Sequence, residues 1–549
     1  MMRAMVQKVK RRRSYTLDYF ITEWTVSDSE SVTLPFVISH TYNCTVDYGD
    51  GTPSLNVSVY NDANATHIYT SGGTYNIRIS GECDAFSANR YPAITTQITD
   101  IIQFGVFPFD LLDFQGCTNL TGYTATDLPI FVAGTDLSHL FQSIPSFVKD
   151  INNWDVSNVV DFTAAFASAD FNLNLDNWDV SKGLEFNSMF AFNSAFDQDI
   201  SGWDVGSATQ MDGMFQSGVF NQNLPNWDVA NVTTFESMFE DNLVFNGTVT
   251  NWVTTSATNM YGMFRNCHAF NQPVNHFDLV GVTDARSMFA ETLVFNQPLN
   301  LWDVSGTGDI ASMFSSSKGF SQDLSSWDVS SKTDLSFMFN SSVFASASIT
   351  GWTVSACTQM RAMFNATNSF NQDIGGWDVS NVTNFYQMFR LNTGFKQDIS
   401  DWDVSSAGVG VTTGLSQIFN AGGMPDSVYT SCLEKWSLLA VNSGVYFQGN
   451  VAYTKTQVDA GTGTTTTANK LVDSAQNFIT TVTINDIIHN TTDGTYAKVT
   501  VIDSNIQLTL NTDIMVSGET YQVETSAAAK GKEVLVNTYG WVMDDEGGV

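Results

Sequence analysis

Apolar residues recur along residues 154–419 in rows of 24 or 25 residues. Each row begins with an aromatic anchor, usually the Trp of a Trp-Asp-Val-Ser phrase, and carries a Phe twelve residues later. A second Phe follows after five or six residues, and only the last row breaks step, with Phe419 seventeen residues after Trp402. This period predicts a solenoid, because one coil cannot bury its own apolar face, whereas stacked coils place identical positions over one another. The predicted internal columns contain Trp154, Trp178, Trp203, Trp227, Trp302, Trp327, Trp377, Phe190, Phe215, Phe239, Phe264, Phe289, Phe314, Phe339, Phe364 and Phe389.

Each coil needs at least one short strand, and the pattern offers two segments for it. We expect the strand around the Asp-Ile-x-x-Trp segment and a helical turn in the Thr-x-x-x-x-Met-Phe segment, although the two could be exchanged. Asn follows the second Phe in six rows, and a stacked Asn column can satisfy buried backbone groups from coil to coil. These residues are Asn172, Asn221, Asn246, Asn271, Asn296 and Asn371.

The phrase FNQDIGGWDVSNVTNFYQMF at residues 370–389 resembles the tandem repeat of BspA-like surface proteins. That family is a leucine-rich-repeat relative found in bacterial surface lipoproteins and in phage-associated proteins. The resemblance covers roughly residues 115–450 and implies a right-handed solenoid, of about eleven to thirteen coils, used for adhesion or display and without catalytic residues. The rows depart from the phrase at Val253 and Thr353, which replace the Asp after Trp, and at Phe277, which replaces Trp.

Residues 14–100 alternate between strand and turn signals and resemble the PKD-type β-sandwich. The matching residues are Asp47, Gly49, Asp50, Gly51, His67, Tyr69, Gly73 and Tyr75. The glycines permit a tight turn, and Asp50 is expected to bond the backbone of that turn. Calcium held by Asp47 and Asp50 stays an alternative to no cofactor at all, although two carboxylates supply too few oxygens.

Residues 101–150 are interpreted as divergent first coils, in which Leu140-Phe141 stands for Met-Phe and Phe147 for the second Phe. At the other end, residues 425–440 predict a helix that begins at Pro425 and Asp426 and covers the last coil. Its apolar residues at helical spacing are Val428, Cys432, Trp436 and Leu439.

BspA-like chains of this type tend to end with an Ala-rich helix and a Tyr-Gly-Trp phrase soon after a segment like SGVYFQGN. Here residues 526–548 supply these features some 75 residues late. The intervening Thr/Val/Ile alternation, with turns at Asn485-Asp486, Asp493-Gly494 and Ser517-Gly518, predicts an inserted β-barrel-like domain, similar to short β modules of phage virion proteins. The Thr/Gly run at 461–467 is expected to be its linker. The expected domains are therefore a basic segment (1–13), a PKD-like sandwich (14–100), the solenoid (101–420), a helical cap (421–460), the inserted β domain (461–525) and a cap helix with tail (526–549).

Charge and cysteine content restrict the partners and the cofactors. The net charge of −33 disfavours nucleic acid and anionic membranes as partners of the body, and no apolar run approaches the ~20 residues of a membrane span. The six cysteines form no CxxC motif, and the sequence leaves open whether Cys44 and Cys83 pair.

The first thirteen residues, MMRAMVQKVKRRR, contain six of the 23 basic residues and are not followed by the apolar stretch of a secretory signal. These cations are Arg3, Lys8, Lys10, Arg11, Arg12 and Arg13. They are interpreted either as a solvated tail or as an electrostatic anchor to a larger assembly.

No motif predicts an enzyme. The six histidines are scattered, and the chain lacks GxSxG, P-loop and dinucleotide signatures. The Asp after each anchor is expected to cap a turn, because Val253 and Thr353 replace it without breaking the repeat. A glycosidase that uses an acid pair is the enzymatic alternative.

The sequence therefore favours a non-enzymatic structural protein on a virion surface, most simply a phage fibre, spike or capsid-decoration subunit that attaches to a host. The alternative is a bacterial cell-surface adhesin. The expected partners are other virion proteins, through the N-terminal region, and a host-surface glycan or protein. A homo-oligomer stays open, as do the receptor, the host and the choice between tail and capsid.

Overall fold

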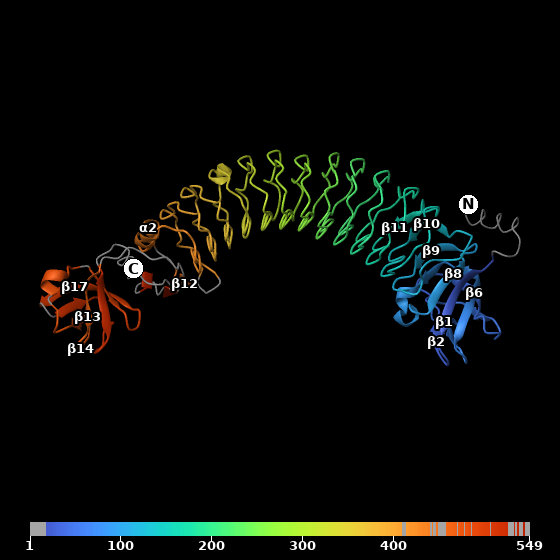
Figure 1. The fold of residues 1–549 in the computed structure, drawn as a ribbon, viewed down its shortest axis with the longest axis horizontal. Coiled ribbons are helices and arrows are strands. Elements are labelled where there is room, and N and C mark those ends of the chain that lie inside the picture. Colours follow the sequence, from blue (N-terminus) through green and yellow to red (C-terminus); the bar gives the residue numbers. More distant parts are fainter. Residues whose placement is uncertain are drawn as a thin grey trace. The chain divides into compact units, whose positions relative to one another are not determined.

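A computed structural model describes residues 18–408 and, with gaps, residues 413–543 (Figure 1). The gaps are residues 440–441, 443–445, 448–456, 469, 477, 485, 505–506, 525–531, 533–534 and 537–541. The predicted anchor cations and the Tyr-Gly-Trp phrase therefore lie outside the described residues. The chain divides into two compact units, Met1–Gln297 and Pro298–Val549.

The described residues are mainly β-structure and turns, which confirms the predicted class. The α-helices with described bounds are α2 (Asp426–Trp436) and α3 (Phe478–Thr481). Short 3₁₀ helices are η1 (Ala63–Ala65), η2 (Ala88–Arg90), η3 (Pro92–Ile94) and η4 (Ala347–Ile349).

An antiparallel five-stranded sheet opens the first unit, in the order β4-β3-β6-β1-β8. Its strands are β1 (Phe20–Val26), β3 (Tyr42–Asp47), β4 (Leu55–Val57), β6 (Gly73–Cys83) and β8 (Ile98–Gln103), and Figure 1 shows β1, β6 and β8 side by side. Strands β2 (Ser31–Thr33) and β5 (Thr66–Ile68) form a second, two-stranded sheet. Alternation along β1 buries Phe20, Trp24 and Val26 on one face, as expected for a half-buried strand.

A parallel ladder begins before the five-stranded sheet is complete. Strand β7 (Ala85–Ser87) pairs with β9 (Pro108–Asp113), and β9 pairs on its other side with β10 (Ile130–Asp136). Strand β10 in turn pairs with β11 (Val159–Asp161). The two sheets share one core, because the Phe20 ring lies 5.2 Å from that of Phe86 and 5.3 Å from that of Phe109. The expected boundary at residue 100 falls inside β8.

Beyond β11 the ladder continues as one parallel bridge per coil. The bridges run from Asp161↔Glu185 to Asn259↔Asp284 in the first unit, and from Asp334↔Gln359 to Asn384↔Gly414 in the second. They lie in the Thr-x-x-x-x-Met-Phe segments, so our first placement of the strand is wrong and the exchanged one is right. In the Asp-Ile-x-x-Trp segment the Asp carboxylate accepts the backbone N–H two residues later, as Asp199 does from Ser201 at 2.9 Å. Such local turns use the donors that a ladder would need.

Within each bridging segment, backbone N–H groups alternate between two kinds of partner. Phe186, Ser188 and Phe190 donate to carbonyls of the next coil at 2.7–3.0 Å, whereas Met189 and Ala191 donate three residues back within their own coil. Two residues of every coil, four positions apart, take left-handed backbone angles, such as Ser188 (φ 54°) and Phe192 (φ 56°). These two conformations stop the turn from propagating as a helix and leave every second donor free for the neighbouring coil.

The predicted core aromatics of both units are buried, and the rings of the Phe column stack on their equivalents in neighbouring coils. In the first unit the rings of Phe190 and Phe215 lie 5.8 Å apart and nearly parallel, and in the second unit those of Phe314 and Phe339 lie 6.0 Å apart. The divergent coil keeps the pairing of the first and second Phe within a coil, because the rings of Phe141 and Phe147 stack at 4.1 Å.

Helix α2 follows the last coil and ends at Trp436 rather than at residue 440. Pro425 precedes its first turn as the N-cap residue. The helix buries Tyr429, Cys432, Leu433 and Trp436, whereas Val428 and Leu439 are half-buried, so the predicted face is rotated by about one residue. Tyr429 contacts the coil through Phe419, with their rings 6.4 Å apart.

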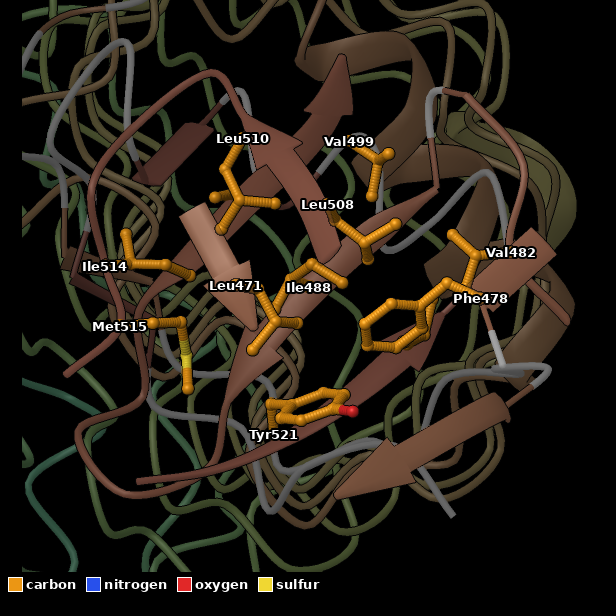
Figure 2. Close-up of a cluster of buried hydrophobic side chains, with 12 residues drawn as sticks. Leu471, Phe478, Val482, Ile488, Val499, Leu508, Leu510, Ile514, Met515 and Tyr521 are labelled. Carbon is orange, nitrogen blue, oxygen red and sulfur yellow. The ribbon is translucent and has the colours of Figure 1, made fainter. Parts of the chain in front are cut away.

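Residues 457–524 form a closed β-domain, here called the barrel. Its strand order is β13-β19-β16-β17-β18-β15-β14, and β13 and β14 are two halves of one bent segment, so the sheet closes on itself. The strands are β13 (Gln457–Thr462), β14 (Thr465–Thr467), β15 (Lys470–Val472), β16 (Ile487–Asn490), β17 (Tyr496–Ser504), β18 (Gln507–Leu510) and β19 (Thr520–Glu524). Figure 2 shows Leu471, Phe478, Leu508 and Tyr521 pointing into its core. The Thr/Gly run 461–467 is not a linker but belongs to strands β13 and β14. Its backbone pairs with β19 before the bend between the two strands and with β15 after it.

The strand that precedes the barrel in sequence pairs with the strand that follows it. Strand β12 (Tyr446–Phe447) pairs in parallel with β20 (Val542–Met543), and these two strands flank the barrel in sequence. The residues on both sides of the insert therefore hold one another.

Candidate functional site

Each anchor tryptophan is fixed by a hydrogen bond between coils. In the first unit Trp203 Nε1 donates to the backbone oxygen of Leu175 at 3.0 Å. In the second unit Trp352 Nε1 donates to that of Leu324 at 3.2 Å. The indole satisfies a carbonyl that would otherwise be buried without a partner, so these aromatics are structural.

Where Phe277 replaces Trp, the residue before it supplies the missing donor. His276 Nε2 lies 3.0 Å from the backbone oxygen of Val249, which is the carbonyl that an indole at position 277 would reach. A carbonyl oxygen can only accept, so this nitrogen carries the proton. His276 therefore has a structural role that the scattered distribution of histidines did not reveal.

The Asp after each anchor caps a turn, as predicted. Asp378 accepts hydrogen bonds from the hydroxyl of Ser380 at 2.7 Å and from its backbone N–H at 3.2 Å. The hydroxyl contact, followed by the backbone contact, holds the pKa of the Asp378 carboxyl below its usual range. The column of carboxylates is thus committed to turns.

The predicted Asn column exists, but it lies at the surface. The side-chain oxygen of Asn221 accepts from the Asn246 backbone N–H at 2.7 Å, and Asn246 does the same for Asn271 at 3.0 Å. The buried polar column lies elsewhere, fifteen residues after most of the anchors, where Asn242 Nδ2 donates to the Phe220 oxygen at 2.9 Å. The expectation of a buried role for the first column is therefore wrong.

The turn at residues 47–52, for which the sequence predicts a PKD-type signature, is closed by its own side chains. Gly49 and Gly51 take φ of 78° and 86°, and Asp50 accepts from the Thr52 backbone at 3.0 Å, as predicted. Asp50 Oδ2 also lies 2.8 Å from His67 Nε2. Burial raises the pKa of Asp50, but hydrogen bonds from Thr52 and His67 outweigh it and lower the pKa to about 2.

The other signature residues of that domain are also engaged within it. The Tyr69 hydroxyl donates to the Tyr48 backbone oxygen at 2.8 Å, and its ring stacks on Tyr75 at 4.4 Å. Asp47 accepts from the Gly49 N–H at 2.9 Å. Throughout the described residues, no group of three or more His, Cys, Asp or Glu side chains is placed to hold a metal ion.

All six cysteines are buried free thiols. Cys44 and Cys83 lie on the neighbouring strands β3 and β6 and are not bonded to each other, which answers the question the sequence left open. Burial raises the pKa of the Cys44 thiol to about 12, so it stays protonated. These thiols act as small core residues.

The outward side chains of the bridging segments form a surface that we call the ladder face. It comprises the partly exposed residues seven, nine, ten, thirteen and fourteen positions after each anchor. In the first unit this surface carries two arginines, Arg265 and Arg286, and carboxylates neutralise both. Arg265 contacts Glu240 at 2.9 Å and Glu291 at 3.3 Å.

Arg286 combines an aromatic contact with a carboxylate contact. Its guanidinium lies over the Tyr261 ring, 5.4 Å from the centroid. Asp284, two residues earlier, binds the edge of the same guanidinium, at 3.0 Å from Nε and 2.6 Å from one terminal nitrogen. The ring thus contacts one face of this side chain, and the acid neutralises its charge at the edge.

In the second unit the ladder face carries two further arginines at the same two repeat positions. Arg361 lies between Phe337 and Tyr386, with its guanidinium 5.2 Å from each ring centroid. The residue two positions earlier is Gln359, whose amide contacts Thr383 and Asn384 instead.

Arg390 is the second of these arginines and is partly buried. Its Nε is buried without a hydrogen-bond partner. Across the described residues neither Arg361 nor Arg390 contacts a carboxylate. Neither arginine was predicted as a site residue, although the aligned rows show a basic residue at these positions and no acid at the positions that neutralise Arg265 and Arg286.

A hollow of about 300 Å³ in the first unit is lined by Asp18, Ser80, Gly81, Val106 and Phe107, which offer one carboxylate and otherwise neutral groups. Among the helices in the described part of the chain, none has both the length and the apolar character that crossing a membrane requires.

Comparison with known proteins gives one match. A family model described as "Mycoplasma protein of unknown function, DUF285" matches residues 135–252, 217–293, 242–348 and 333–443. Together these overlapping stretches cover more than half of the 549 residues and follow the aromatic rows. No curated protein and no solved structure matches the chain.

Proposed function

We propose, from the premise that the chain belongs to the DUF285 family of tandem repeats, that it is a non-enzymatic display and attachment protein. In this proposal the repeats form a BspA-like, leucine-rich-repeat-related solenoid of about eleven to thirteen coils. A PKD-like domain precedes the solenoid, and the barrel is a module inserted into its C-terminal cap.

The observation that carries this proposal is the use of the backbone in the coils. Every second N–H of a bridging segment bonds the next coil, and the Trp, Met-Phe and Phe side chains fill the interior. What remains for function is an outward surface repeated coil by coil. Such a surface is suited to attachment through many weak contacts whose avidity comes from repetition.

The first location that we propose is the surface of a virion, in a phage fibre, spike or capsid-decoration subunit. Two features support it: the cation-rich residues 1–13, which would bind other virion proteins, and the inserted barrel. Removing residues 1–13 tests the anchor. We expect the truncated protein to enter particles poorly, and incorporation of the full chain to fall with added salt, because the contact is electrostatic. Full, salt-insensitive incorporation of the truncated protein would contradict the anchor.

The second location is a bacterial cell surface, which the description of the matching family as a Mycoplasma protein favours. Mass spectrometry of purified particles and of proteins released from intact cells by protease distinguishes the two. Peptides from residues 154–419 should appear in the particle sample if the first location is correct. Their presence only in the cell-surface sample would replace it with the second.

A further inference from the structure

We infer that the ladder face of the second unit binds a carboxylate-bearing glycan through Arg361 and Arg390. This inference rests on the proposed attachment function and names the chemistry of the surface that would be recognised. It comes from comparing two pairs of arginines at equal positions of the repeat, one pair neutralised within the protein and the other not.

The neutralised pair shows how this scaffold binds a carboxylate. Arg286 presents one face to the Tyr261 ring, and the in-plane N–H groups along its edge hold Asp284. Stacking uses the face of a guanidinium and leaves the edge donors for an acid, so the two contacts are compatible. The first unit therefore contains, in Asp284, an internal example of the group that a ligand would supply.

Arg361 has the aromatic contacts but lacks the acid. Two rings, Phe337 and Tyr386, hold its guanidinium at 5.2 Å from each centroid, so its orientation is fixed before any ligand arrives. Gln359 occupies the position equivalent to Asp284, and a neutral amide leaves the edge of Arg361 without a counter-charge. An exposed, preorganised guanidinium is suited to bidentate binding of a planar carboxylate.

Arg390, in the coil after that of Arg361, shows the same contrast at the second repeat position. Its equivalent, Arg265, lies between Glu240 of the preceding coil and Glu291 of the following one. The corresponding neighbours of Arg390 are Asn365 and Ala421, neither of which carries charge. Two guanidinium groups on adjacent coils are thus available to an anionic chain that crosses the coils.

The surrounding charge supports an anionic ligand. In a chain of 56 acidic and 23 basic residues, Arg361 is the only charged residue between positions 335 and 372. The ladder face also carries Asp334, the bridge partner of Gln359, but its carboxylate accepts the Ser336 backbone N–H at 2.7 Å and so belongs to a turn. Between positions 379 and 397 the only charged residues are Arg390 and Lys396. The amides of Asn340 and Asn365, which bond each other at 2.8 Å, line the same face and match the hydroxyl groups of a sugar.

Among polyanions, a glycan fits better than nucleic acid. Double-stranded DNA carries one charge per roughly 1.7 Å, and the net charge of −33 on this protein would repel such a density. An acidic glycan has a lower charge density and presents hydroxyl groups between its carboxylates. Two arginines flanked by amides and aromatic edges match that pattern.

Titration calorimetry on the purified full chain tests the inference, with a hexamer of galacturonic acid as the probe. We expect Arg361→Ala and Arg390→Ala each to weaken binding by about tenfold or more, because each removes a charge-assisted contact. Arg286→Ala is the matched control and should leave the affinity unchanged, because Asp284 already occupies that site.

Gln359→Asp is the decisive variant, because it supplies Arg361 with the acid that Arg286 has and removes no contact of the arginine with its rings. We expect it to weaken binding by about tenfold or more, as Arg361→Ala does, while the cooperative thermal unfolding of the protein is kept. Retention of full affinity by Gln359→Asp, or equal binding of the methyl-esterified hexamer, would overturn the inference.

Hexaglutamate and a short DNA duplex complete the set of probes. Binding of either one as tightly as the galacturonate hexamer would replace the glycan with an acidic peptide or a nucleic acid. Failure of the wild-type protein to bind the hexamer would also refute the inference. It would leave the proposed attachment function standing, because that function is tested separately by incorporation into particles and by surface localisation.

Discussion

The repeat coils and the barrel of the second unit are both β-rich, but they pair the chain with itself in opposite ways. In the coils, parallel bridges such as Gln359↔Asn384 join the same position of successive rows. In the barrel, antiparallel pairs such as β16–β17 and β17–β18 join strands that are neighbours in sequence. A ring in the coils therefore packs against copies of itself, whereas a barrel residue packs against unlike side chains (Figure 2).

This difference shows what a repeated sequence reveals and what it hides. Repetition makes the core positions recognisable in the sequence, because the positions that stack must keep their residue type. It also leaves the outside free to vary from coil to coil, so functional contrasts such as that between Arg286 and Arg361 appear only when rows are compared. The barrel has no internal copy with which such a comparison could be made.

The sharpest test separates the two cores by removing one ring from each. Phe314 stacks on Phe320 at 3.9 Å in the coils, and Phe478 lies in the barrel core; both are fully buried. Replacing either by Ala should cost about 3–5 kcal/mol, from lost transfer energy plus a cavity. Hydrogen exchange with mass spectrometry should place the loss of protection in the coils for Phe314→Ala and in the barrel for Phe478→Ala. Equal loss in both regions would show that they unfold together.

A pH titration should distinguish the start of the parallel ladder from the barrel. Burial raises the pKa of the Asp113 carboxyl, at the end of β9, to about 6, although hydrogen bonds from Ser87 and Gln115 oppose the shift. The folded state then binds this proton more tightly than the unfolded state. The free energy of unfolding should therefore fall, by up to about 3 kcal/mol, as the pH rises from about 4 to about 6.

Asp113→Asn should remove that fall, because the amide is neutral at every pH. Tryptophan fluorescence during urea unfolding is a suitable measurement, since all 13 tryptophans lie outside residues 457–524 and the barrel does not contribute. An unchanged pH profile in the variant would assign the dependence to another group.

The hydrogen bond of His276 provides a test within the coils themselves. His276→Ala should leave the Val249 oxygen without its donor and lower the stability by about 1–2 kcal/mol. Adding Phe277→Trp to this variant should restore the loss, because an indole at that position reaches the same carbonyl in other coils. Failure of the rescue would mean that the histidine contributes by packing.

The smallest expected effect is that of removing the barrel. Deleting residues 457–524 should change the free energy of unfolding of the coils by no more than about 0.5 kcal/mol, because β12 and β20 pair with each other and not with the barrel. Tryptophan fluorescence and circular dichroism would follow it. A large loss of stability would show that the coils depend on the insert.

The aromatic columns could be predicted because one period fixes them, and the turn function of Asp50 could be predicted from local turn chemistry. The choice between two strand segments could not, because it depends on competition for backbone donors. Asp199 and its equivalents settle that competition by binding N–H groups locally. The left-handed residues on either side of each Met-Phe pair had a signal, since Ser, Gly or Ala often precedes the Met, but small residues alone do not specify that conformation.

The boundaries of the barrel and the two arginines of the proposed ligand-binding face were missed for different reasons. Residues 461–467 look like a linker because Thr and Gly are common in both linkers and edge strands, and only the closure of the sheet distinguishes them. Arg361 and Arg390 were missed because charged residues on a repeat are usually solvated, and the informative fact is the absence of a neighbouring acid. The absence of an acid can be seen only by comparing neighbouring coils, because a single row does not show which residues lie beside the arginine.

The alternation of hydrogen bonds within each coil also has a genetic consequence. Every coil offers its successor the same set of donors, so an in-frame loss or duplication of one 25-residue row, within either unit, leaves donors and acceptors matched at the new junction. Similar rows are encoded by similar DNA, which recombines unequally with itself. The number of rows is therefore expected to vary between lineages while both ends of the protein stay constant. Unequal recombination would then lengthen or shorten the protein by one row at a time.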